Sequence, residues 1–183
     1  MKIRLAADLQ KDSIVDGDGI RTVIWTQGCP HNCFGCHNPS THDFNDGALF
    51  DVEDIKKKID DLIYQDGITF SGGDPMCQVD ACVEIAKYAK TKGLNIWCYT
   101  GYTFEQLLEL GKKKKSYIDF LENIDVLVDG KFVMELKSLD CKYRGSTNQR
   151  LVDVKKSLST SKVCLWENDI QILSFKKNKY LYV

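Results

Sequence analysis

The chain has 183 residues, of which 43% are hydrophobic and 28% are charged, and its formal net charge is −1. This composition is typical of a globular domain with a buried core, and the balanced charge gives no reason to expect a nucleic-acid surface. No apolar run approaches the roughly 18–20 residues of a membrane span, and the N-terminus lacks the apolar stretch of a secretory signal. We therefore expect a cytoplasmic protein without a membrane or nucleic-acid partner.

Strands and helices are expected to alternate along most of the chain. β-Branched and aromatic residues predict strands at residues 20–26, 67–71, 94–99 and 125–128. Apolar residues at helical spacing predict helices between them, at residues 51–64, 79–92 and 104–110. Gly93 is expected to cap the second of these helices.

This order of elements predicts an α/β fold. Strands separated by single helices form right-handed βαβ units and a mainly parallel sheet. The units are too few to close an eight-stranded barrel, so we expect an incomplete open (βα) barrel over residues 1–150. Residues 151–183 differ in character, because short strands are expected at 163–166, 170–175 and 180–183, with a hairpin turn at 167–169. They predict a short β-rich C-terminal extension packed on the core.

The cysteines give the strongest chemical signal. Three of the eight lie within eight residues, as Cys29, Cys33 and Cys36 in a C-x3-C-x2-C arrangement. In a reducing compartment, cysteines indicate metal binding or burial rather than disulfides. A cubane iron–sulfur cluster takes four ligands, so three thiolates would leave one iron open to a substrate. With His31 or His37 the same thiols could instead form a structural zinc site, although such sites usually show paired C-x2-C or H-x3-H units.

Two further stretches place polar groups after predicted strands. Gly72 and Gly73 allow close approach of the backbone to a ligand, and the carboxylate of Asp74 could pair with an ammonium group. The same residues also make a good turn. Thr100 follows the next strand, at the sheet edge where ligands of open α/β sheets gather. Asp129 has a similar placement, but an Asp-Gly pair after a strand is more often only a turn.

Several motifs resemble a known family. The C-x3-C-x2-C motif with Phe34 after its second cysteine resembles the signature of the radical S-adenosylmethionine superfamily. Gly-Asp-Gly-Ile-Arg at 17–21 and Cys-His-Asn-Pro at 36–39 resemble the glycyl-radical activating enzymes. Ser-Gly-Gly-Asp-Pro at 71–75, Trp-Cys-Tyr-Thr-Gly-Tyr at 97–102, Val-Leu-Val-Asp-Gly-Lys-Phe at 126–132 and Arg-Gly-Ser-Thr-Asn-Gln at 144–149 are similar to activating proteins of anaerobic ribonucleoside-triphosphate reductases. Short members of this family lack a counterpart of residues 151–183.

The resemblance implies a cofactor set and a reaction. Cys29, Cys33 and Cys36 would bind one 4Fe–4S cluster, whose fourth iron would bind S-adenosylmethionine. The other residues expected to contact S-adenosylmethionine are Gly35, His37, Gly72, Gly73, Asp74 and Thr100. Reductive cleavage would yield a 5′-deoxyadenosyl radical, which would take a hydrogen atom from a glycine of the large reductase subunit. An electron donor such as flavodoxin would supply the electron.

Two alternatives stay open. The chain could activate another glycyl-radical enzyme, such as one of the formate lyase type, or it could be a zinc-binding interaction module without redox activity. Residues 144–149 could form a lid, contact a partner or serve only as a loop.

Overall fold

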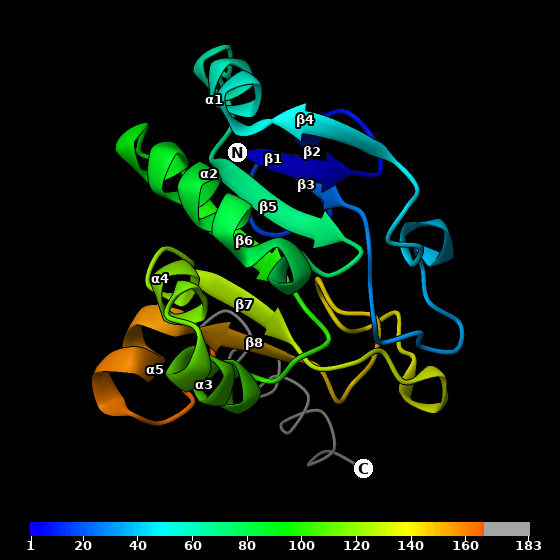
Figure 1. Ribbon diagram of the computed structural model, residues 1–183. Coiled ribbons are helices and arrows are strands. Elements are labelled where there is room, and N and C mark those ends of the chain that lie inside the picture. Colours follow the sequence, from blue (N-terminus) through cyan, green and yellow to red (C-terminus); the bar gives the residue numbers. More distant parts are fainter. Residues whose placement is uncertain (167–183) are drawn as a thin grey trace.

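The computed structural model describes residues 1–166 (Figure 1). They form a mixed α/β fold on one eight-stranded sheet of order β4-β1-β3-β5-β6-β7-β8, with β2 paired to β3. The strands are β1 (Lys2–Leu5), β2 (Gln10–Ser13), β3 (Arg21–Thr26), β4 (Ala48–Asp51), β5 (Gly67–Gly72), β6 (Asn95–Tyr99), β7 (Val126–Asp129) and β8 (Arg150–Asp153). The helices are α1 (Val52–Asp60), α2 (Val79–Thr91), α3 (Phe104–Lys113), α4 (Ser116–Leu121) and α5 (Val154–Thr160), with short 3-10 turns η1 (Pro39–Thr41), η2 (Pro75–Gln78) and η3 (Met134–Leu136).

The centre of the sheet is parallel and its flanks are antiparallel. Strands β3, β5, β6 and β7 pair in parallel, which confirms the four strands expected from the sequence. Strands β1, β2, β4 and β8 add antiparallel pairings and were not predicted. Each has only four residues, and β2 (Gln-Lys-Asp-Ser) has no apolar side chain, so its pairing with β3 decides its conformation.

The two faces of the sheet hold different sets of side chains. On β6, Ile96 and Cys98 join the large core that the helices cover, whereas Trp97 between them points to the opposite face. This alternation follows from the two-residue period of a strand. On the second face the Trp97 ring meets the rings of Tyr143 and Trp166 edge-on, each at a centroid distance of 5.1 Å. In Figure 1 the helices lie toward the left, and the loops that follow the parallel strands lie toward the right.

The helices differ from the prediction mainly at their ends. Helix α1 stops at Asp60 rather than at residue 64, and α3 continues to Lys113 rather than ending at residue 110. Helices α4 and α5 were missed because six or seven residues are too few to show a helical period. The cap of α2 is confirmed, because Gly93 has a φ of +76° and the next amide, that of Leu94, donates back to the Ala89 carbonyl.

The C-terminal part begins inside the sheet. Strand β8 begins at Arg150, the last residue of the expected core, and extends the sheet beyond β7, and α5 follows it directly. The strand expected at 163–166 is reduced to a single bridge between Leu165 and Val152. The strands expected at 170–175 and 180–183, and the turn at 167–169, lie outside the described residues. The division into a core and an extension stays a prediction. None of the helices within residues 1–166 is long and apolar enough to cross a bilayer.

Candidate active site

A pocket of about 420 Å³ opens at the carboxyl ends of the parallel strands. Its walls come from the loop after β3, the turn after β5, the end of β6 and the segment between β7 and β8. This is the edge where ligands of parallel sheets bind, and the volume is within the usual range for a small-molecule site. The residues expected from the sequence that line it are Cys29, Cys33, Cys36, His37, Gly72, Gly73 and Thr100.

The cysteine loop is closed at its base by backbone hydrogen bonds. Gly28, with a φ of +99°, turns the chain out of β3, and its amide donates to the Thr41 carbonyl at 2.9 Å. The amide of Cys29 donates to the carbonyl of His42 at 3.1 Å. Inside the loop, the Cys36 amide donates to the Cys33 carbonyl at 3.1 Å. The loop therefore presents its three half-buried free thiols to one pocket.

This donor set fits a cluster with three cysteine ligands. No group of three or more His, Cys, Asp or Glu side chains in residues 1–166 converges on one point suited to a single ion. A cubane takes one thiolate on each of several irons, so its ligands stand apart around it. Burial raises the pKa of the Cys29 thiol, with Asp74, Cys33 and Cys36 acting in the same direction and a backbone hydrogen bond at His31 opposing them. Bound iron would displace that proton, because a coordinating thiol is deprotonated.

The two glycines after β5 are required by the neighbouring backbone as well as by the pocket. A Cβ at Gly72, whose φ is +98°, would lie 2.5 Å from the Thr26 carbonyl oxygen, and one at Gly73 would lie 2.4 Å from that of Gly28. The Gly73 amide donates to Thr26 at 2.7 Å, and the Asp74 amide donates to Gly28 at 2.9 Å. The turn is thus packed directly against the segment that leads into Cys29.

Asp74 does not line the pocket, in contrast to Gly72 and Gly73. Its side chain is fully buried, and its carboxylate accepts from the amides of Met76 and Gly101, each at 3.0 Å. It also accepts from the Thr100 hydroxyl at 2.9 Å and lies 2.7 Å from Nε2 of His31. Protein donors already satisfy the carboxylate of Asp74. Its expected pairing with the ammonium group of a ligand stays a prediction.

Gly35 is the other expected residue outside the pocket lining. It has a φ of +72°, and a Cβ there would lie 2.9 Å from the Met134 methyl group. Gly35 therefore shapes the loop between the second and third cysteines and lets η3 approach it.

The 144–149 motif folds back on the end of β7. The Gln149 side chain accepts from the Gly145 amide and donates to the Gly130 carbonyl, both at 2.9 Å. Arg144, Gly145 and Gln149 line the pocket, so this loop forms one of its walls. Asp129 does not line the pocket. Its carboxylate stabilises the fold, because it accepts from the Phe104 amide at 2.8 Å and from Nε of Arg150 at 2.9 Å.

Sequence analysis missed the roles of Arg21 and His31. Arg21 is buried and donates to the hydroxyl of Thr69 at 2.6 Å and to the carbonyls of Ile68 and Asn95. Burial lowers its pKa to about 10. The sequence feature that could have pointed to this role of Arg21 is its position in the Gly-Asp-Gly-Ile-Arg motif. His31 had no comparable signal, because its partner Asp74 is 43 residues away.

Comparison with known proteins identifies the family. A family model described as a 4Fe-4S single cluster domain matches residues 15–152. The anaerobic ribonucleoside-triphosphate reductase-activating protein of Salmonella typhimurium is 38% identical over 144 residues, covering 74% of this chain and 90% of that protein. The proteins of the same name from Escherichia coli K12 and enterobacteria phage T4 are 37% and 35% identical, covering 74% and 75% of this chain and 90% and 86% of their own lengths. The crystal structure of QueE from Escherichia coli gives a TM-score of 0.45 at 16% identity, covering 56% of this chain and 54% of that chain, which is too low to support a conclusion. The chain belongs to the family of anaerobic ribonucleoside-triphosphate reductase-activating proteins and contains that family's 4Fe-4S single cluster domain.

Proposed function

We propose that this protein activates an anaerobic ribonucleoside-triphosphate reductase by radical chemistry on S-adenosylmethionine. When bound, the 4Fe–4S cluster supplies the electron that cleaves S-adenosylmethionine to methionine and a 5′-deoxyadenosyl radical, and this radical takes a hydrogen atom from a glycine of the large reductase subunit. The observation that supports the proposal best is the shared pocket. Three thiols of one loop face the same space of about 420 Å³ as Gly72, Gly73 and Thr100.

Each wall of the pocket has a proposed task. Cys29, Cys33 and Cys36 hold the cluster, and the backbone of Gly72 and Gly73 offers polar groups to the methionyl end of S-adenosylmethionine. His42 also lines the pocket, and its buried Nε2 has no hydrogen-bond partner among the described residues.

Aromatic side chains form other parts of the wall. They belong to Trp25, Tyr99, Phe132 and Tyr143. Apolar walls exclude water from a reactive intermediate and limit its side reactions.

The proposal also covers the fold of the protein, its redox environment and its partners. The three successive parallel pairings from β3 to β7, with helices over one face, support an incomplete open (βα) barrel. All eight cysteines are free thiols within the described residues, in keeping with a reducing cytoplasm. We propose a flavodoxin-type protein as the electron donor. We propose no direct contact with nucleic acid or with a membrane.

Anaerobic reconstitution with iron and sulfide, followed by reduction and addition of S-adenosylmethionine, tests the chemistry. We expect 5′-deoxyadenosine from the wild type and from Cys164→Ala, a control thiol outside the pocket lining, and none from Cys33→Ala. A full, reducible cluster that cleaves no S-adenosylmethionine, with or without the reductase, would contradict the proposal. Tight zinc binding without iron uptake would support the interaction-module alternative instead.

A further inference from the structure

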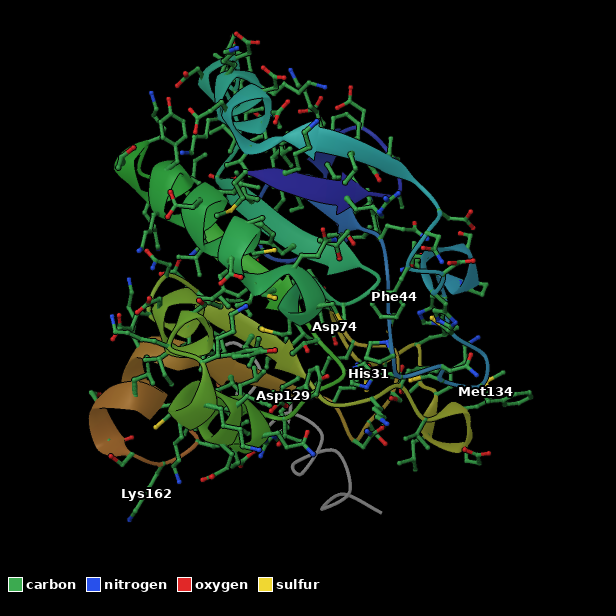
Figure 2. All side chains as sticks on the ribbon, viewed as in Figure 1. His31, Phe44, Asp74, Asp129, Met134 and Lys162 are labelled. Atoms are coloured by element: carbon green, nitrogen blue, oxygen red, sulfur yellow. The ribbon has the colours of Figure 1, made fainter. Side chains whose placement is uncertain are left out.

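The middle of the cysteine loop is tied to the turn after β5. Nε2 of His31, midway between Cys29 and Cys33, lies 2.7 Å from Oδ2 of Asp74. The contact is shielded from water, since the side chains are only 7% and 1% exposed. Figure 2 shows both residues among the loops at the carboxyl ends of the strands. A hydrogen bond to a buried carboxylate is among the stronger ones in proteins.

The imidazole of His31 is also held by packing. Its ring meets that of Tyr102 edge-on, with centroids 4.6 Å apart. A Cβ at residue 101 would lie 2.3 Å from the His31 ring, so Gly101 leaves the space that this ring fills. The His31 ring is therefore fixed by the residues that follow β6 as well as by Asp74.

Asp74 is a rigid anchor for this contact. The amides of Met76 and Gly101 and the hydroxyl of Thr100 all donate to its carboxylate. These bonds belong to η2 and to the end of β6, both outside the cysteine loop. A carboxylate held in one position needs no further ordering when His31 binds it, which makes it an effective support for a loop.

We propose that His31 is the positioning residue of the cysteine loop: its bond to Asp74 holds the segment from Cys29 to Cys33 in place before iron arrives. The two thiols are then presented to the pocket without an ordering step, and the loop retains the cluster more firmly. The part of this inference that concerns retention of the cluster rests on the proposed function, whereas the part that concerns the order of the loop does not.

Two variants separate the hydrogen bond from the packing. His31→Phe keeps an aromatic ring against Tyr102 and Gly101 but has no donor for Asp74. His31→Gln supplies an amide donor in place of the imidazole nitrogen. If the bond matters, the glutamine variant resembles the wild type and the phenylalanine variant does not.

The first readout uses the metal-free protein. Under anaerobic conditions, alkylation of each cysteine is followed by mass spectrometry, with Cys164 as an internal reference. We expect His31→Phe to raise the rates at Cys29 and Cys33 about tenfold relative to Cys164, because loss of a bond to a buried charged group frees the loop. His31→Gln should stay near the wild-type rates. Wild-type rates at both thiols in His31→Phe, or an equal rise at Cys164 from general destabilisation, would overturn the proposal.

The second readout is the loss of iron from the reconstituted protein to a chelator. Residues that support metal ligands typically change metal affinity 10–100-fold, so we expect about tenfold faster loss from His31→Phe and near wild-type loss from His31→Gln. Equal loss from both variants would also overturn the proposal. If the wild type takes up no cluster or cleaves no S-adenosylmethionine, the proposed function fails, and the alkylation rates still decide the role of His31 in the loop.

Discussion

A methyl group at residue 73 has no room in the structure. The Cβ of Gly73→Ala would lie 2.4, 2.8 and 2.9 Å from the carbonyl oxygen, carbonyl carbon and amide nitrogen of Gly28. All three are backbone atoms, so the turn after β5 and the segment before Cys29 must separate by about 1 Å to reach ordinary contact. Such overpacking destabilises a fold by about 1–3 kcal/mol. For a chain of this length, that lowers Tm by roughly 2–12 °C.

Gly93→Ala is the matched control. A Cβ there meets nothing within 4 Å, and the penalty comes only from its φ of +76°. A left-handed alanine costs about 1–2 kcal/mol, similar to the overpacking at residue 73. Gly93 lies between α2 and β6, at the end of the sheet away from the cysteine loop.

The assay combines thermal unfolding of the metal-free proteins with iron content after anaerobic reconstitution. We expect both alanine variants to lower Tm, and only Gly73→Ala to lower the iron content, because it displaces the backbone next to Cys29. Wild-type Tm and iron content in Gly73→Ala would refute the steric argument. Equal iron loss in Gly93→Ala would show that global stability, rather than the position of the loop, controls cluster uptake.

Three further predictions concern charged and buried groups. The Arg150 guanidinium lowers the pKa of Glu105 from 4.5 to about 2, so the stability from this pair is complete above pH 4.5 and is lost as the pH falls through about 2. Glu105→Gln should reduce the loss of unfolding free energy over that pH range by about 0.2–1 kcal/mol, since the pair is partly exposed, and an acid-unfolding curve identical to that of the wild type would contradict this. Asp129→Ala leaves the buried Phe104 amide without its acceptor and removes a partner of Arg150; urea denaturation should show a loss of about 2–4 kcal/mol, and a loss below 1 kcal/mol would contradict the assigned role. Although Cys77 is an exposed residue, partial loss of hydration around its thiol and, to a lesser degree, nearby Asp74 raise the pKa of that thiol to about 12, so iodoacetamide at neutral pH should alkylate it at least tenfold more slowly than a free cysteine, and an equal rate would contradict this.

The parallel centre of the fold could be predicted because its signals are local. Buried central strands such as β3 and β5 are rich in β-branched residues, and Gly93 marks the end of α2. Strand β2 could not be predicted, because none of its side chains is apolar and its conformation depends on β3. Strand β8 has two buried apolar residues, Leu151 and Val152, but four residues are too few to show a strand pattern, and it becomes a strand by pairing with β7.

The candidate site likewise combines features that are visible in the sequence with contacts that only the fold creates. The spacing of the three cysteines is visible in the sequence, and the pocket brings them together with Gly72, Gly73 and Thr100 as expected. The protein donors that hold the carboxylate of Asp74 could not be read from the sequence, and its expected contact with a ligand stays a prediction. Its contact with His31 joins residues 43 positions apart, and only the packing of β5 and β6 beside the loop brings them together.

Glycyl-radical formation on the reductase tests the central claim most directly. The reduced, reconstituted protein is incubated with S-adenosylmethionine and the large subunit of an anaerobic ribonucleoside-triphosphate reductase, and the radical is detected by electron paramagnetic resonance. A formate lyase serves as the competing acceptor, and the Cys33→Ala protein as the inactive control. We expect a glycyl radical on the reductase that requires both S-adenosylmethionine and Cys33. A radical on formate lyase alone, or no radical on the reductase despite a full cluster and cleavage of S-adenosylmethionine, would contradict the account.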